Sequence, residues 1–114
     1  MVNVPRIGEI YWVDLGEPVG HEQGFHRPGV IVSRHSFNAT RSALAVVMPV
    51  TTRDRGIPSH RPLDHTACGL DRPSWVRTEN FRAISHLRLG GFIGQVSPAE
   101  LADLHRMLGI HLKI

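Results

Sequence analysis

The sequence predicts a mainly β domain that ends in a single helix, and three observations support this fold class. Short runs rich in β-branched and aromatic residues fill the first two-thirds of the chain, separated by glycine and proline. Residues 97–114 instead repeat leucine at helical spacing. The length of 114 residues suffices for one modest hydrophobic core. We therefore expect a single domain over residues 1–114, a small and strongly bent sheet or barrel capped by a helix.

The first predicted strand covers residues 7–15 and ends at the turn signal Gly-Glu-Pro of residues 16–18. Its apolar residues do not alternate strictly, which indicates a strand that is buried in part on both faces. The second predicted strand covers residues 29–33, which are β-branched and directly follow Pro28.

The third predicted strand is the apolar run of residues 44–50. Pro49 favours an edge or a bulge near its end, because proline cannot donate a hydrogen bond to a strand ladder. Glycine and proline indicate a loop over residues 54–59, and a weaker strand is expected near residues 61–64. Further strands are expected over residues 74–78, 81–85 and 91–96.

The C-terminal helix is predicted by a capping box at residues 97–100, Ser-Pro-Ala-Glu. Gly109 is expected to fray the last turns, because glycine costs about 1 kcal/mol relative to alanine in a helix. One apolar stripe of the helix is expected to contain Leu101, Leu104, Leu108 and Leu112.

The charge of the chain comes almost entirely from arginine, since the net charge is +3 and Lys113 is the only lysine. The planar guanidinium suits phosphate oxygens better than the point charge of lysine does. The composition therefore favours a polyanionic partner, although a host that encodes arginine in preference to lysine would give the same bias.

Several classes of protein are disfavoured by what the sequence lacks. Cys68 is the only cysteine, which excludes an intramolecular disulfide and a cysteine-cluster metal site. No apolar stretch approaches the roughly 18 to 20 residues of a membrane span, and residues 1–6 lack the apolar segment of a secretory signal. We therefore expect a cytoplasmic protein without a membrane partner.

The eight histidines raise the question of a metal site, and their spacing argues against one. His21 and Glu22 begin like a zincin motif, but the next histidine, His26, follows five residues after His21 rather than four. His105 and His111 are six residues apart, which separates them around a helix, so we expect both at the surface. No metal and no other cofactor is predicted. Nucleophile-elbow and Walker-type motifs are also absent.

A basic and polar cluster remains on the loops that flank the predicted strands. Arg27 precedes the second strand, and Thr51 and Thr52 end the third. If these strands are neighbours, a guanidinium and a hydroxyl converge on one phosphate. The alternative is a surface salt bridge for Arg27 and a simple strand-end residue for Thr51.

Four segments in order resemble the MazF/PemK family, the ribonuclease toxins of bacterial toxin–antitoxin pairs. The stretch "GEIYWVDLGEPVGHEQGFHRPGVIVS" (8–33) resembles the family's first strand and its Gly-x-Glu-Gln-Gly-x-x-Arg-Pro loop. The third strand and its threonine resemble "VVMPVTTR" (46–53), and "GIPSHRPLD" (56–64) is similar to the following Pro-x-His segment. The later strand, with its acidic-amide pair and arginine, resembles "VRTENFRAIS" (76–85). The resemblance covers nearly the whole chain, including the terminal helix.

This resemblance implies a small SH3-like barrel of the MazF/CcdB type that works as a homodimer. It implies metal-independent, sequence-specific cleavage of single-stranded RNA, in which the ribose 2′-OH attacks the adjacent phosphate and leaves 2′,3′-cyclic phosphate and 5′-OH ends. It further implies inhibition of translation and a cognate antitoxin partner. By position, the family's essential arginine and threonine fall on Arg27 and Thr51. The expected RNA contacts are Glu22, Gln23, Gly24, Phe25, Thr52, Glu79, Asn80 and Arg82.

The chemistry of Arg27 and Thr51 supports their assignment, because preorganised donors aimed at the phosphorane oxygens lower the activation barrier of RNA cleavage. Arg27 stays protonated at neutral pH, so it serves as an electrostatic clamp or an acid rather than as the base. His26, whose unperturbed pKa lies near 6.5, is a candidate for acid–base catalysis. The alternative for His26 is a loop residue that contacts RNA or solvent.

The aromatic residues offer stacking faces for unpaired bases or simply pack in the core. We expect core packing for Trp12 and Trp75, and stacking on RNA as an option for Phe25, which lies in the polar loop. Two other functions compete with the nuclease: a small basic barrel that binds nucleic acid without cutting it, and a CcdB-like gyrase poison. Gyrase poisons of that kind act through a C-terminal segment with a tryptophan, which residues 109–114 lack.

Overall fold

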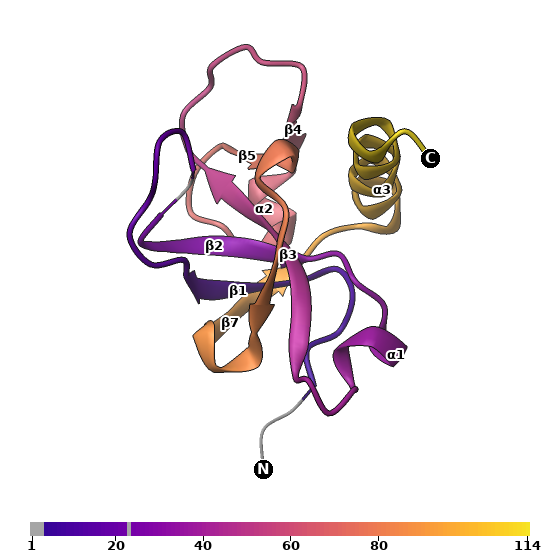
Figure 1. Ribbon diagram of the computed structural model, residues 1–114. Helices are drawn as coiled ribbons and strands as arrows, with labels where there is room; N and C mark the ends of the chain where they lie inside the picture. The colour runs from indigo at the N-terminus through magenta and orange to yellow at the C-terminus, as the bar shows by residue number, and fades with distance from the viewer. Residues whose placement is uncertain (1–3, 23) are drawn as a thin grey trace.

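The computed structural model describes residues 4–22 and 24–114 as a bent antiparallel sheet with a C-terminal helix, which confirms the predicted fold class (Figure 1). The strand order is β4-β5-β3-β2-β1-β7, and β6 pairs with β3 off this path. The strands are β1 (Glu9–Asp14), β2 (His26–Ile31), β3 (Leu44–Thr51), β4 (His60–Leu63), β5 (Ser74–Arg77), β6 (Arg82–Ser85) and β7 (Leu89–Gln95). The α-helices are α1 (His35–Asn38), α2 (His65–Cys68) and α3 (Pro98–Leu112), with 3-10 turns η1 (Thr78–Asn80) and η2 (His86–Arg88).

Two prolines lie inside strands at points where a neighbouring strand is missing on one side. β2 begins at His26, earlier than predicted, so Pro28 lies within it opposite Trp12 of β1; the β2–β3 ladder is registered only from Gly29 onward. Pro49 does not mark an edge, because β3 pairs with β2, β5 and β6. On the side away from β2, strand β3 pairs with β6 over residues 44–47 and with β5 over residues 50–51. Pro49 falls between these two ladders, where a missing N–H is tolerated.

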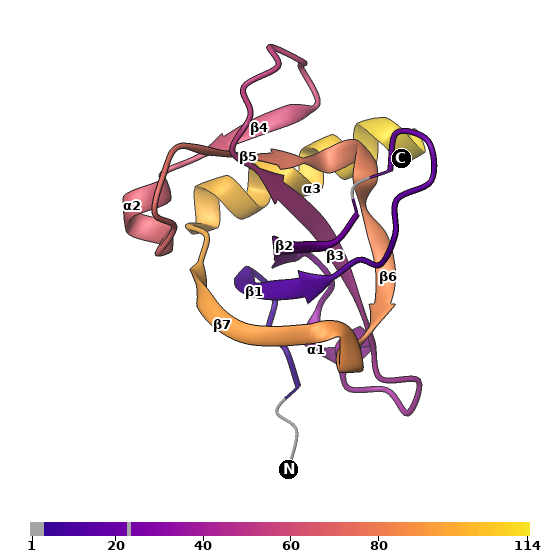
Figure 2. The same ribbon diagram turned by 90° about the vertical axis from the view of Figure 1, so that its left-hand side faces the viewer.

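The core forms two clusters on opposite faces of the central strands β1, β2 and β3. Ile10, Val30 and Met48 belong to the cluster that packs against Leu104 of α3. The second cluster contains Val13, Leu15, Ile31, Ala45, Val47 and Ile84. Figure 2 shows β6 and β7 curving around the central strands, with α3 lying along another side. Because β1 is buried on both faces, apolar and polar residues do not alternate strictly over residues 7–15.

Helix α3 begins at the predicted capping box. The Ser97 hydroxyl accepts a hydrogen bond from the Glu100 N–H at 3.1 Å, and the Glu100 carboxylate accepts one from the Ser97 N–H at 2.8 Å. The helix continues past Gly109 to Leu112, and the Gly109 carbonyl accepts the N–H of Ile114. The expected fraying at Gly109 is therefore wrong for this structure.

The apolar stripe of α3 differs from the predicted one at its C-terminal end. Leu104 and Met107 are buried, Leu101 and Leu108 are half-buried, and Leu112 is 49% exposed. At 100° per residue, Met107 and Leu112 lie on opposite sides of Leu104, so the buried face of the helix is rotated toward Met107 and away from Leu112. This is a correction of the predicted stripe.

The helical histidines are exposed, as expected, and their imidazole Nε2 atoms hold α3 against the sheet. His105 Nε2 lies 2.9 Å from the carbonyl oxygen of Val32, and His111 Nε2 lies 2.9 Å from the hydroxyl of Thr78. No helix in the described part of the chain is both long enough and apolar enough to cross a membrane.

The contact between α2 and β7 predicts a strong effect of Gly94→Ala. A methyl group at Gly94 would overlap the Cys68 carbonyl oxygen, so the helix must move away from the strand. We expect a loss of about 1–3 kcal/mol in the free energy of unfolding, the usual cost of overpacking. Chemical denaturation measures it. Gly91→Ala in the same strand is the matched control, because a Cβ there lies at an ordinary 3.9 Å from Trp12. Equal stability of the two variants would contradict the proposed close contact.

Candidate active site

The predicted site residues meet at the end of the sheet where β1 and β3 end and β2 begins. In the β1–β2 ladder, Val13 is opposite Arg27, and Asp14 is opposite His26. The β2–β3 ladder pairs Gly29 with Pro49. Figure 1 shows the start of β2 and the end of β3 on the same side of the molecule, beside the loop between β1 and β2.

The register of β2 against β3 relates Arg27 to Thr51. Arg27 lies two residues before Gly29, and Thr51 lies two residues after Pro49. Residues two apart in a strand share a face, so the continued register sets Arg27 opposite Thr51 on one face. The last registered pair is Gly29 and Pro49, so Arg27 and Thr51 lie two residues beyond it. Both residues are therefore at the same end of neighbouring strands.

The hydroxyl of Thr51 is held in one orientation while its proton stays available. Its oxygen accepts a hydrogen bond from the Arg53 N–H at 3.2 Å. A threonine hydroxyl has one donor and two acceptor positions, so it can still donate to an anion. Arg27 and Thr52 are exposed. The end of the sheet therefore presents a guanidinium and a hydroxyl donor to solvent.

The loop between β1 and β2 is closed by hydrogen bonds at its base. The Leu15 N–H donates to the Phe25 carbonyl at 3.0 Å, and the Phe25 N–H donates to the Gly16 carbonyl at 2.6 Å. Gly24 packs so closely on Pro18 that a Cβ there would overlap the proline ring. Glu22 is exposed, and its carboxylate accepts the Val19 N–H at 3.0 Å. Gln23, a predicted RNA contact, lies outside the described residues.

Phe25 has an unusual backbone conformation for a bulky residue. Its φ is +62°, in the left-handed region, and its side chain is 59% exposed. An L-residue in this region is strained by roughly 1–2 kcal/mol. Backbone strain of this kind clusters at functional sites.

Two arginines attach this loop to the rest of the site. The guanidinium of Arg82 donates to the Leu15 carbonyl at 3.2 Å, at the base of the loop. The guanidinium of Arg77 donates to the His21 carbonyl at 3.3 Å, near its tip. Arg77 also lies 3.8 Å from the carboxylate of Glu79. The predicted RNA contacts Glu79 and Arg82 are thereby brought to the loop.

Glu79 is held by a buried histidine. The Nε2 atom of His60 lies 2.9 Å from one carboxylate oxygen of Glu79, and the Ser59 hydroxyl donates to the other at 3.1 Å. Desolvation alone would raise the pKa of Glu79, but hydrogen bonds from His60, from its own backbone and from Ser59 outweigh it and hold the pKa below its usual value. The Oδ1 atom of neighbouring Asn80 is buried, without a hydrogen-bond partner among the described residues.

His60 and Arg77 are not among the site residues predicted from the sequence, although both lie in the segments that carry the resemblance. A histidine and an arginine in strands give no signal by themselves. Only their contacts with Glu79 and His21 show that they organise the site.

The expected core packing of Trp12 is wrong, because its side chain is 48% exposed. Its neighbours across the sheet are Pro28 in β2 and, in β7, Gly90 and Gly91, which have no side chains to cover it. Trp75 is half-buried. Among residues 4–22 and 24–114, no three His, Cys, Asp or Glu side chains gather as the ligands of a metal would.

Comparisons with known proteins cover the whole candidate site. The model of the PemK-like, MazF-like toxin of type II toxin–antitoxin systems matches residues 6–112. The chain is 39% identical over 114 residues to endoribonuclease MazF9 of Mycobacterium tuberculosis (strain ATCC 25618 / H37Rv), covering 96% of this chain and 97% of that protein.

Two solved structures share the fold over nearly their full length. The crystal structure of MazF (Form-I) from Deinococcus radiodurans superimposes with a TM-score of 0.87 at 25% identity, covering 99% of this chain and 100% of that one. A mycobacterial endoribonuclease in complex with its cognate antitoxin gives a TM-score of 0.77 at 25% identity, covering 99% and 97%.

The lowered pKa of Glu79 predicts how acid affects stability. A carboxylate with a depressed folded-state pKa stabilises the fold above its unfolded pKa of about 4.3, and this contribution is lost as the pH falls through the folded value. Glu79→Gln removes the titrating group. We therefore expect wild type to be more stable than Glu79→Gln near pH 6, with the difference shrinking toward pH 3. Thermal unfolding across this range measures it, with the exposed loop variant Glu17→Gln as control. A constant difference between wild type and Glu79→Gln would contradict the interpretation.

Proposed function

The chain belongs to the PemK-like, MazF-like toxins of type II toxin–antitoxin systems, and from this premise we propose how it acts as an endoribonuclease. It cleaves single-stranded RNA at specific sequences, needs no metal ion, and thereby inhibits translation. The ribose 2′-oxygen attacks the adjacent phosphorus, and the bond from phosphorus to the 5′-oxygen breaks. The products carry a 2′,3′-cyclic phosphate and a 5′-OH. The register that sets Arg27 opposite Thr51 is the observation that carries the proposal.

Arg27 and Thr51 stabilise the negative charge that gathers on the phosphorane oxygens. Arg27 offers a charged fork of N–H donors, and Thr51 offers one O–H donor whose oxygen is already held by the Arg53 N–H. Both lie on rigid strands, so little reorganisation accompanies the reaction. Arg27, as a permanent cation, also donates a hydrogen bond to the leaving 5′-oxygen and stabilises its charge, and solvent supplies the proton of the 5′-OH product.

A group that accepts the 2′-OH proton is needed as well, and His26 is our hypothesis for it. His26 is exposed and is the first residue of β2. Adjacent residues in a strand point to opposite faces, so His26 reaches a linkage on Arg27 only around the end of the strand. The pH–rate profile of His26→Ala tests the hypothesis: a profile identical to wild type removes His26 from the mechanism.

The RNA follows the loop between β1 and β2 and continues to η1. Glu22, Gln23, Gly24, Phe25 and Thr52 border the linkage on the loop side. Glu79, Asn80 and Arg82 contact bases on the other side. The contacts of Arg82 with Leu15 and of Arg77 with His21 support one continuous surface. The buried Oδ1 of Asn80 is an acceptor for a base N–H once the side chain turns outward.

The protein partners follow from family membership. We propose a homodimer in the cytoplasm that is neutralised by a cognate antitoxin, as one structurally similar endoribonuclease was solved with its own antitoxin. An acidic antitoxin segment suits the net charge of +3. An acidic peptide is therefore expected to compete with RNA, and added salt to weaken both.

The test of the proposed function is incubation of the pure protein with a long defined RNA in EDTA. Site-specific fragments with cyclic phosphate and 5′-OH ends support the proposal. Binding without fragments would instead make the chain a non-catalytic nucleic-acid-binding barrel. Cleavage that requires added metal would refute the metal-independent chemistry.

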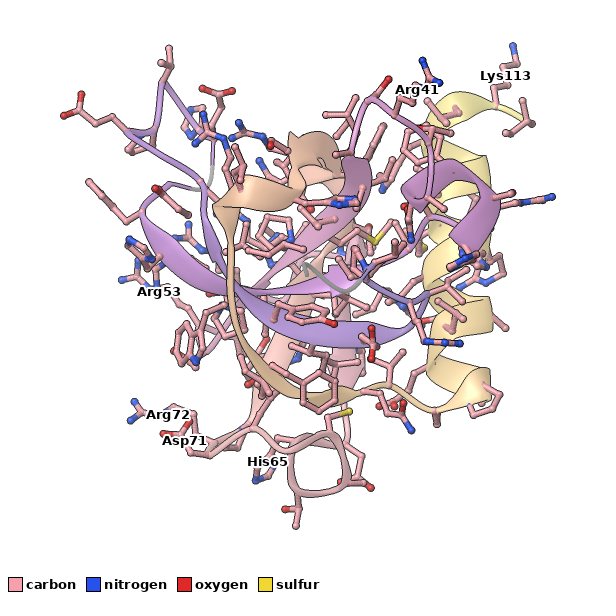
Figure 3. The ribbon with its side chains drawn as sticks, turned by 90° about the horizontal axis from the view of Figure 1, so that it is seen from below. Arg41, Arg53, His65, Asp71, Arg72 and Lys113 are labelled. Carbon is pink, nitrogen blue, oxygen red and sulfur yellow. The ribbon has the colours of Figure 1, made fainter. Side chains whose placement is uncertain are left out.

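In the same assay, Arg27→Ala and Thr51→Ala are each expected to lower the cleavage rate at least 100-fold, about the cost of removing a transition-state donor. Thr51→Ser, which keeps the hydroxyl, should retain most activity. Arg41→Ala is the matched control, since Arg41 is exposed on the side of the molecule away from Arg53 (Figure 3). Near-normal cleavage by Arg27→Ala or Thr51→Ala would show that the wrong residue has been assigned.

Because the backbone of Phe25 is strained, replacing Phe25 with glycine is expected to raise stability and to lower activity. Phe25→Gly relieves the positive φ, so the unfolding free energy should rise by about 0.5–1 kcal/mol after the entropy cost of glycine. Loss of the aromatic face should lower cleavage at least fivefold, as for a lost base stack. Ala43→Gly, at a φ of +51° away from the site, is the control: it should stabilise equally and cleave normally. Unchanged cleavage by Phe25→Gly would remove Phe25 from the RNA surface.

A further inference from the structure

An aromatic hollow lies beside the candidate active site and has no role in the function described so far. It has a volume of about 390 Å³. Its walls are Trp12 of β1, Pro28 of β2, Leu70 and Asp71 from the segment between α2 and β5, and Phe92 and Ile93 of β7. Trp12 and Phe92 are 48% and 58% exposed. Two large aromatic side chains are thus left uncovered at one opening.

The geometry of β7 leaves the indole of Trp12 open. The β1–β7 ladder is irregular between Tyr11 and Val13, next to Gly90 and Gly91. A Cβ at Gly90 would lie 3.3 Å from the Cβ of Trp12, so glycine here allows the strands to approach closely. Phe92 is fixed edge-on by the ring of Tyr11, at a centroid distance of 5.6 Å. The hollow is therefore a built feature with rigid walls.

The hollow lies close to the candidate active site along the chain, on the opposite face of the β1–β2 pair from the Arg27 side chain. Trp12 is opposite Pro28, and Pro28 directly follows Arg27. A cross-strand Cα pair lies about 4.5–5.5 Å apart and consecutive Cα atoms about 3.8 Å, so the Cα atoms of Trp12 and Arg27 lie within about 9 Å. Their side chains leave opposite faces of the sheet. The β2–β3 ladder is absent before Gly29, so an RNA that passes around this edge of β2 can reach the side chains of both Trp12 and Arg27.

The charges around the hollow favour a nucleic acid as its occupant. Arg53 and Arg72 are exposed and project from the same margin of the molecule in Figure 3. Asp71 forms a loose ion pair with Arg72, at 3.7 Å, while Arg53 adds a second guanidinium on this side. Cationic residues that follow a backbone, interleaved with aromatic faces that stack bases, are how proteins bind single-stranded nucleic acid.

We propose that Trp12 is the stacking platform for the unpaired base next to the scissile linkage, and that Trp12 thereby contributes to substrate selection. This inference rests on the proposed function. The base enters the hollow between Trp12, Leu70 and Phe92, while its phosphate lies toward Arg27. Trp12 is a substrate-binding residue that makes no contact with the reacting atoms.

The test combines a protein variant with a missing base. First, cut sites are mapped on a defined transcript, and short RNAs with one site are made intact or with an abasic ribose at the position before or after the linkage. Trp12→Ala should lower kcat/KM on the intact RNA about 5- to 150-fold, the range for one base stack. At one of the two positions, the abasic RNA should lower wild-type kcat/KM by a similar factor and leave Trp12→Ala almost unaffected, because both changes remove the same contact.

The control variants separate stacking from folding and from protein association. Trp12→Phe keeps a flat face and should retain most of the wild-type rate, whereas Trp12→Leu fills space without stacking and should behave like Trp12→Ala. Phe37→Ala removes another exposed aromatic side chain, which is 41% exposed in α1, and should leave the rate unchanged. Thermal unfolding and size-exclusion chromatography establish that the variants fold and associate as wild type does.

The results that would overturn the inference are specific. Wild-type rates for Trp12→Ala and Trp12→Leu would show that no base stacks there. If the fall in kcat/KM from Trp12→Ala multiplies with the fall from the abasic RNA at both positions, Trp12 acts independently of either base, and the effect lies outside base recognition. A changed oligomeric state in these variants would make the hollow a protein-docking surface. If wild type cleaves no RNA at all, the proposed function fails instead, and the two failures are thus distinguishable.

Discussion

The register of β2 against β3 is the constraint on which the candidate active site depends. The side-chain period of a strand is two residues, so a slip of one residue would turn Arg27 to the face opposite Thr51. Packing in the two clusters opposes such a slip, because Val30 and Met48 are buried in one cluster while Ile31 and Val47 are buried in the other. A slip of one residue would move a side chain of β2 from the cluster it fits into the other one. The two-sided core thus does more than stabilise the fold, since it also sets the geometry of the two donors.

The two strand prolines fit this constraint. Pro28 and Pro49 lack N–H donors, and each lies where a neighbouring ladder is absent on one side. The registered β2–β3 pairs end at Gly29 and Pro49, so Arg27 and Thr51 lie just beyond the last pair, at the same end of the two strands. Proline at these positions weakens no existing ladder and ends the pairing at the edge of the site.

The electrostatics of the site are organised by residues outside the reacting pair. Glu79 is held by His60 and Ser59, Arg77 lies between Glu79 and His21, and Arg82 reaches Leu15. These contacts tie η1 and β6 to the β1–β2 loop across large separations in the chain. A loop with this many attachments presents its backbone and side chains with little entropy left to lose on binding. The aromatic hollow at Trp12 lies on the other face of the β1–β2 pair.

The sequence by itself determined the fold class, the capping box of α3, most strands, and the residue types suited to phosphate. These depend on local patterns: β-branched runs, turn residues and helical spacing act over a few positions. Only the tertiary structure decided which side chains are covered. Trp12 is exposed because its cross-strand neighbours are Pro28, Gly90 and Gly91, and Leu112 is exposed because the buried face of α3 is rotated toward Met107. The roles of His60 and Arg77, and the facing of Arg27 and Thr51, likewise depend on strand pairing between distant segments, which no local pattern encodes.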